Sequence, residues 1–125
     1  MNNIEFSFEK LMVWQDSRQL VSSVYKLLKT FPSEERFALC DQIRRAVISV
    51  PSNIAEESGR ISAKEKCHFI DIAFGSLMET YCQLQLSCDL GYIDEEKLKE
   101  IKVSVSEISR KLSGLRNHFE NLAKQ

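Results

Sequence analysis

The last third of the chain carries a run of apolar residues whose spacing alternates strictly between three and four positions. The residues in this register are Leu98, Ile101, Val105, Ile108, Leu112, Leu115, Phe119 and Leu122. This alternation is the heptad spacing that places every apolar side chain on one seam of an α-helix. Because such a seam has to be buried against other helices, it predicts an all-α protein.

Three further segments with helical periodicity precede this seam. We expect helices over residues 8–30, 34–57, 63–90 and 95–122. Only four glycines and two prolines interrupt the 125 residues, which favours long elements. Helices of this length joined by short loops predict an antiparallel up-and-down four-helix bundle, with residues 1–125 forming a single domain.

Short polar residues precede each expected helix. The expected N-caps are Ser7, Ser33, Ser62 and Asp94. Ser62 also begins a capping box that Glu65 completes. We expect Gly59 to end the second helix in the left-handed conformation and Gly91 to end the third helix.

Charge and hydropathy limit the classes of function. The 17 basic and 18 acidic residues give a net charge of −1, which argues against a strongly basic nucleic-acid-binding protein. No apolar run approaches the ~20 residues that a transmembrane helix needs, and the first residues lack the pattern of a signal peptide. We therefore expect a cytoplasmic protein that does not contact membranes.

The four cysteines show no pattern typical of a metal site or a disulfide. They are Cys40, Cys67, Cys82 and Cys88, with no Cys-x-x-Cys pair and no zinc-finger spacing to histidine. All four fall within expected helices, where we expect them to be buried as small apolar side chains.

The first and third expected helices are apolar over a wider arc than one bundle core needs. Trp14, Tyr25, Phe74 and Tyr81 lie on the wider faces. Aromatic side chains are enriched at subunit interfaces, so we expect a homo-oligomer that buries these four residues. The alternative is a monomer in which Trp14 and Tyr25 cover the edge of the bundle.

The segment from Gln42 to Arg60 combines an apolar stripe with polar residues and a proline. Pro51 removes a backbone donor in mid-helix and predicts a kink, where Ser49 or Asn53 can bond the freed carbonyl groups. This polar stripe is interpreted either as a solvated face or as a partly buried network that fixes helix register. The candidate network consists of Arg45, Ser49, Asn53, Glu56 and Glu79.

Glu79 belongs to the third expected helix, where we expect it to pair with Arg45 or Arg44 of the second. Nearby, Gly75 lies in mid-helix, which costs about 1 kcal/mol relative to alanine. Close approach of a neighbouring helix would offset that cost.

Glu65 and His68 have the Glu-x-x-His spacing used in di-iron bundles. Those sites need a second such motif, and the sequence has none. We therefore expect a protein that is not an enzyme and has no catalytic residue, metal or cofactor. The alternative is an enzyme or metal-binding bundle that uses Glu65, His68 and Glu79.

Basic residues gather in the central third of the chain. The candidate nucleic-acid contacts are Arg36, Arg44, Arg60, Lys64 and Lys66. Acidic neighbours nearly balance them, so a mixed-charge solvated surface is the simpler interpretation. Symmetry in an oligomer would multiply even a modest basic patch, which keeps nucleic-acid binding open.

Several motifs, taken in order, resemble a known family. They are FEKLMVWQ from Phe8, FPSEERFAL from Phe31, QIRRA from Gln42, SVPSNIAE from Ser49, the Gly59-Arg60 pair, and GSL-x-E from Gly75. Together they resemble the four-helix-bundle proteins encoded in intervening sequences of bacterial 23S rRNA genes, also labelled S23 ribosomal proteins. The resemblance extends from Phe8 to about Tyr92.

The resemblance implies a bacterial four-helix bundle from a family in which most members have no established activity. Members are also similar to the accessory protein of diversity-generating retroelements, a homopentamer that binds nucleic acid and a reverse transcriptase. The resemblance therefore implies a homopentamer that binds RNA, DNA or a nucleic-acid-associated protein. One residue departs from the pattern, since Glu57 stands where the family usually has the glycine of NIAEG.

Overall fold

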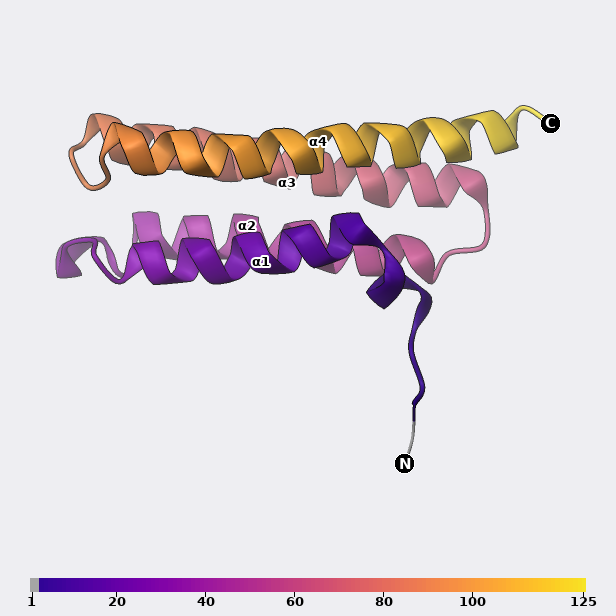
Figure 1. The fold of residues 1–125 in the computed structure, drawn as a ribbon, viewed down its shortest axis with the longest axis horizontal. Coiled ribbons are helices and arrows are strands. Elements are labelled where there is room, and N and C mark those ends of the chain that lie inside the picture. Colours follow the sequence, from indigo (N-terminus) through magenta and orange to yellow (C-terminus); the bar gives the residue numbers. More distant parts are fainter. Residues whose placement is uncertain (1–2) are drawn as a thin grey trace.

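The computed structural model describes residues 3–125. Its α-helices are α1 (Met12–Leu28), α2 (Leu39–Ser58), α3 (Ala63–Asp89) and α4 (Glu95–Ala123), and its short 3-10 helices are η1 (Ser7–Lys10) and η2 (Ser33–Glu35). These described residues contain no strand, which confirms the predicted all-α bundle. Consecutive helices are joined at alternating ends of the bundle, as an up-and-down arrangement requires (Figure 1). No helix of the described part has the length and apolar character needed to cross a membrane.

Two of the four predicted N-caps are confirmed. The Ser62 hydroxyl accepts a hydrogen bond from the Glu65 N–H at 3.1 Å, and the Asp94 carboxylate accepts one from the Lys97 N–H at 2.8 Å. These caps satisfy amide groups that have no partner within the first turn. At the other end of α3, Gly91 adopts a φ of 84°, which is the left-handed conformation expected after a helix.

The other two predicted caps are wrong, as is the conformation predicted for Gly59. Ser7 and Ser33 each begin a 3-10 helix, and α1 and α2 start later, after Leu11 and Ala38, without a side-chain cap. Ala38 has a φ of −118° and a ψ of −99°, which separates the η2 turn from α2. Gly59 has a φ of −88° and stays in the right-handed region, so α2 ends there without a left-handed residue.

The core lies along the centre of the bundle. Its largest fully buried apolar side chains are Val24, Ile43, Val47, Val50, Ile54, Ile70, Leu77, Leu84, Ile108 and Leu112. The heptad seam of α4 is buried from Ile101 to Leu112, but Leu122 is 45% exposed. The last turns of α4 extend past the neighbouring helices in Figure 1, so the seam loses its partners there.

Not all four cysteines are buried as predicted. Cys40 is buried, and Cys67 and Cys88 are half-buried, but Cys82 is exposed on α3. The prediction for Cys82 is wrong because α3 turns this position away from the other helices.

Candidate functional site

Hydroxyl and amide groups join α2 to α3 near Pro51. The Ser49 and Ser76 hydroxyls lie 2.8 Å apart, and the Asn53 amide donates to the Ser49 carbonyl at 2.8 Å and to its hydroxyl at 2.9 Å. α2 continues through Pro51 without a break. Asn53 binds the Ser49 carbonyl and not that of Val47, which lacks the Pro51 donor, so the predicted bond to a freed carbonyl is not found among the described residues. The hydroxyl pair ties one turn of α2 to one turn of α3.

The charged members of the predicted network do not form the predicted ion pair. Arg45 and Glu79 are exposed, and the ion pairs within residues 3–125 do not include one that joins Glu79 to Arg45 or Arg44. Arg44 instead binds Asp41 at 2.6 Å, and Glu56 binds Arg60 at 2.8 Å. The predicted cross-helix ion pair is therefore wrong.

Two further residues of α3, Gln83 and Ser76, complete the polar contact between α2 and α3, and neither was among the predicted network residues. The amide of Gln83 donates to Gln42 Oε1 and to Glu79 Oε2, both at 3.3 Å. Gln83 and Ser76 lie seven positions apart on the side of α3 that faces α2. Their shared helical register was the signal that would have revealed them.

The residues of the metal-binding alternative are not brought together. Glu65, His68 and Glu79 are exposed, and the 11 residues from His68 to Glu79 span about 16 Å of helix. One ion cannot bind all three side chains. Across the described chain, no group of three His, Cys, Asp or Glu side chains has the geometry to hold a metal ion.

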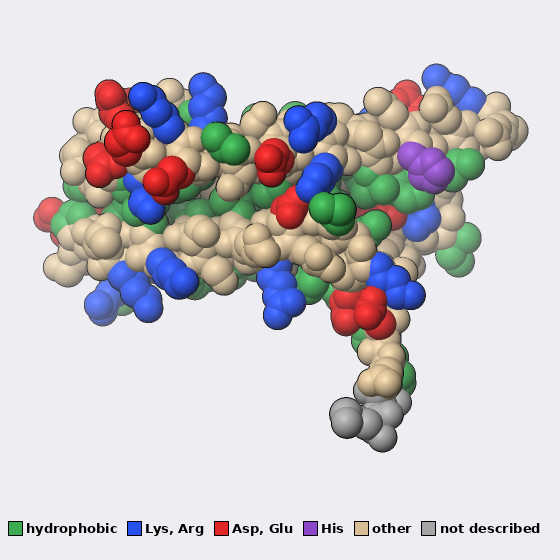
Figure 2. Space-filling model, viewed as in Figure 1, with side chains coloured by type: hydrophobic (Ala, Val, Ile, Leu, Met, Phe, Trp, Pro, Cys, Tyr) green, Lys and Arg blue, Asp and Glu red, His purple; other side chains and the backbone are tan. Residues whose placement is uncertain are grey.

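The candidate nucleic-acid contacts divide between the two ends of α2. Arg36 and Arg44 lie near the α1–α2 connection, whereas Arg60, Lys64 and Lys66 lie near the α2–α3 connection. The 16 residues from Arg44 to Arg60 correspond to about 24 Å. In Figure 2, Lys and Arg side chains follow the outer edge of α1, while α4 carries both signs of charge. The five residues therefore do not form one patch within a single chain.

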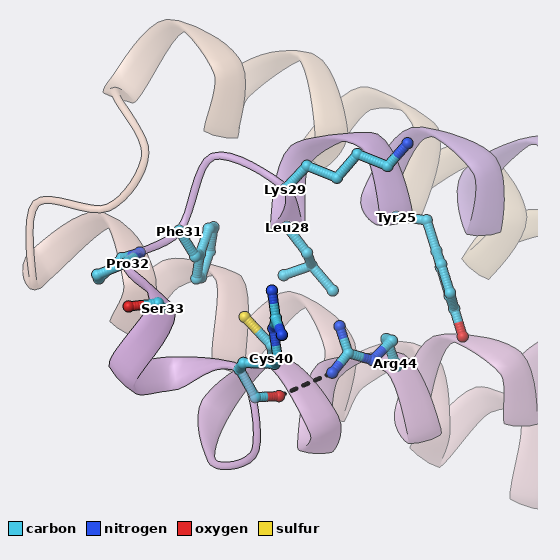
Figure 3. Close-up of a pocket in the computed structure, with 9 residues that line it drawn as sticks. Tyr25, Leu28, Lys29, Phe31, Pro32, Ser33, Cys40 and Arg44 are labelled. Atoms are coloured by element: carbon cyan, nitrogen blue, oxygen red, sulfur yellow. Dashed lines mark hydrogen bonds between the residues drawn. The ribbon is translucent and has the colours of Figure 1, made fainter.

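At the α1–α2 end, two of these basic residues line a cavity of about 440 Å³. The lining residues are Tyr25, Leu28, Lys29, Phe31, Pro32, Ser33, Arg36, Cys40 and Arg44. Arg44 Nη2 donates to the Arg36 carbonyl at 2.7 Å (Figure 3). It also donates to Asp41 at 2.6 Å. The bond to Asp41 raises the pKa of the Arg44 guanidinium, so this group stays charged. Burial raises the pKa of the Cys40 thiol, which keeps the thiol neutral.

The four aromatic residues predicted at a subunit interface are half-buried and pack against the core of their own chain. Trp14, for example, contacts Phe8 edge to face with ring centroids 4.9 Å apart. Their burial by another subunit stays a prediction. Exposed apolar side chains also lie along α3 and its C-cap, where Ile72, Leu86 and Leu90 are 37%, 50% and 59% exposed.

A model of the 23S rRNA-intervening sequence protein family matches residues 9–114. The chain belongs to this family. A crystal structure of a family relative agrees, since it is described as a protein with unknown function from the S23 ribosomal protein family of Bacteroides thetaiotaomicron VPI-5482. It matches with a TM-score of 0.77 and 25% identity, over 84% of this chain and 95% of that chain. No curated protein matches this chain.

Glu57, the residue that departs from the family pattern, is buried in this member of the 23S rRNA-intervening sequence family. Its side chain is only 3% exposed, and its Oε1 lies 3.3 Å from the ammonium of Lys66. No donor among the described residues reaches its other oxygen, Oε2. Burial raises the pKa of the Glu57 carboxyl, and the charge of Lys66 opposes this effect. Lys66 thus pairs with a buried carboxylate, and its ammonium also lies 5.1 Å from the centre of the Phe119 ring.

Proposed function

We propose that this member of the 23S rRNA-intervening sequence family is a non-enzymatic homo-oligomer that acts as a binding scaffold. The proposed partner is nucleic acid or a protein associated with nucleic acid. The observation that supports the assembly is the outward face of α3 and its C-cap, where Ile72, Leu86 and Leu90 are exposed. Cys82 and Gly75 lie between them on the same face. Positions recurring at three- and four-residue steps fall on one side of a helix, so these residues form a strip that Glu79 interrupts between Gly75 and Cys82.

Gly75 supports a contact between subunits rather than within one chain. A Cβ built at this position meets no atom within 4 Å. No neighbour among the described residues therefore requires glycine, and the expected close approach of a helix does not occur within one chain. Glycine in mid-helix costs about 1 kcal/mol relative to alanine. Close approach of a helix from another subunit would offset this cost, because glycine lets two backbones come together.

The mass in solution tests the assembly. For the homopentamer that the family resemblance implies, light scattering should give five times the 14.4 kDa of one chain. Leu86→Glu should shift the mass toward that of one chain, because it places a charge in the proposed contact. Val103→Glu is the matched control, since Val103 is 62% exposed on α4, away from this strip. A monomer mass for the unmodified protein would contradict the proposal.

Gel shifts test the nucleic-acid part. With structured RNA, we expect binding that weakens as salt rises, because basic side chains displace counterions from phosphates. Binding that is absent even at low salt would contradict nucleic-acid binding and leave the protein-partner version. The oligomer mass is measured separately, so the two parts of the proposal fail independently.

A further inference from the structure

We propose that the cavity at the α1–α2 end binds the phosphomonoester of a nucleotide, either a free nucleotide or the 5′-phosphorylated end of a strand. The site lies within one chain. It therefore needs neither the oligomer nor a long nucleic acid, and it goes beyond the scaffold role.

The charge of the lining favours an anion. Among the described residues that line the cavity, Lys29, Arg36 and Arg44 are cations and none is a carboxylate. Neither Lys29 nor Arg36 forms an ion pair with another residue of 3–125. Arg44 makes both of its bonds through Nη2. A guanidinium carries five N–H donors, so Arg44 keeps others for a ligand.

The start of α2 adds to the positive potential. Cys40, in the first turn of α2, lines the cavity, and no side chain caps this helix. Uncapped amide groups and the helix dipole favour anions at such an end. Of the nearby acids, Asp41 pairs with Arg44 and offsets part of its charge, so Lys29 and Arg36 supply the unpaired cations, while Glu35 accepts a hydrogen bond from Tyr92 at 2.7 Å.

The shape and the apolar side of the cavity fit a nucleotide better than inorganic phosphate. Its volume of about 440 Å³ lies within the roughly 300–1,000 Å³ typical of small-molecule sites. Tyr25 from α1 and Arg44 from α2 flank the same space in Figure 3. A tyrosine ring offers a stacking surface for a base, while the arginines bind the phosphate. The neutral Cys40 thiol leaves no negative charge on the wall.

Calorimetry at low salt tests the site with four probes: inorganic phosphate, adenosine 5′-monophosphate, and a tetranucleotide with either a 5′-phosphate or a 5′-hydroxyl. We expect the nucleotide and the 5′-phosphorylated strand to bind, and inorganic phosphate and the 5′-hydroxyl strand to bind at least about tenfold more weakly. For the 5′-hydroxyl strand this is the loss expected for one charge-assisted contact, and for inorganic phosphate it is the loss of base stacking on Tyr25. Tyr25→Leu should remove the preference for the nucleotide over phosphate.

Variants of adjacent arginines separate this cavity from general surface charge. Arg44→Gln and Arg36→Gln should each weaken nucleotide binding about tenfold or more. Arg45→Gln should not, because Arg45 is exposed and lies outside the cavity. Lys29→Gln should also weaken nucleotide binding. Lys29 is exposed and can be replaced without breaking an internal ion pair.

Three results would overturn the inference. They are absence of nucleotide binding by the unmodified protein, equal affinity for phosphate and nucleotide, and equal losses in Arg44→Gln and Arg45→Gln. None of these depends on the oligomer mass or on gel shifts with long RNA. Failure here is therefore distinguishable from failure of the scaffold.

Discussion

Replacing Lys66 with methionine should destabilise the protein far more at neutral pH than at acidic pH. Methionine keeps an apolar stem against Phe119 but removes the ammonium that lies 3.3 Å from Glu57 Oε1. It also removes the hydrogen bond that Lys66 donates to the Glu57 carbonyl at 3.2 Å. A buried carboxylate without its partner cation is strongly unfavourable.

The size of the effect follows from the distance and the burial. At 3.3 Å and an effective dielectric constant near 20, the attraction of two unit charges is about 5 kcal/mol. The Lys66 side chain is 20% exposed, so solvent screens part of this attraction. We expect Lys66→Met to lower the free energy of unfolding by about 2 to 3 kcal/mol at neutral pH.

The dependence on pH follows from the pKa of Glu57. Burial raises it in the folded protein, and Lys66 holds it lower than burial alone would. A carboxyl whose folded pKa exceeds its unfolded value of about 4.3 stabilises fully below that value. This stabilisation is lost as pH rises through the folded pKa. Because Lys66→Met raises the folded pKa further, its deficit should be small near pH 4 and grow toward neutrality.

Urea unfolding followed by circular dichroism, at one protein concentration, measures the deficit at each pH. Lys64→Met is the matched control, because Lys64 is exposed two positions earlier on α3. Adding Glu57→Gln to Lys66→Met should restore stability at neutral pH, since the buried charge is then gone. An equal deficit at acidic and neutral pH, or an equal deficit in Lys64→Met, would refute the reasoning.

Three further changes probe the helices. Gly75→Ala should raise the stability of the isolated chain by about 1 kcal/mol yet lower the oligomer mass, as measured by chemical unfolding and light scattering. An unchanged mass would contradict the α3 contact. Ser62→Ala should cost about 1 kcal/mol through loss of the α3 cap, whereas exposed Ser104→Ala should cost almost nothing in the same urea titration. Ile108→Ala, at a fully buried position, should cost about 2 to 5 kcal/mol by thermal unfolding, and a loss below 1 kcal/mol would contradict the assigned core.

Capping residues predicted the start of a helix correctly where no long-range contact of the same segment competes with the cap. Ser62 and Asp94 cap their helices as expected. Ser33 precedes acidic residues in the same way but does not begin α2. There Phe31 packs against Tyr92 with ring centroids 5.4 Å apart, and Glu35 bonds the same tyrosine. These long-range contacts accompany a short 3-10 turn in place of the predicted helix start.

The candidate sites were harder to predict because side-chain direction depends on packing. The polar stripe of α2 was identified, but its charges point into solvent while hydroxyl and amide groups meet α3. The burial of Glu57 requires a lysine from the next helix, nine positions later, which periodicity does not reveal. The cavity at the α1–α2 end combines residues from two helices and a connection, so no single motif indicates it.

The Ser49 and Ser76 hydroxyls, which bond α2 to α3 near the middle of the bundle, carry no charge. The ends of α2 differ, because each carries an ion pair. Salt screens the ion pair of Arg44 with Asp41 near the start of α2, whereas acid neutralises Glu57, the partner of Lys66, near its end. The alignment of α2 with α3 at Ser49 does not depend on either condition. When salt is raised, the start of α2 should therefore loosen while the two central turns keep their alignment, and amide hydrogen exchange should slow toward the middle of both helices.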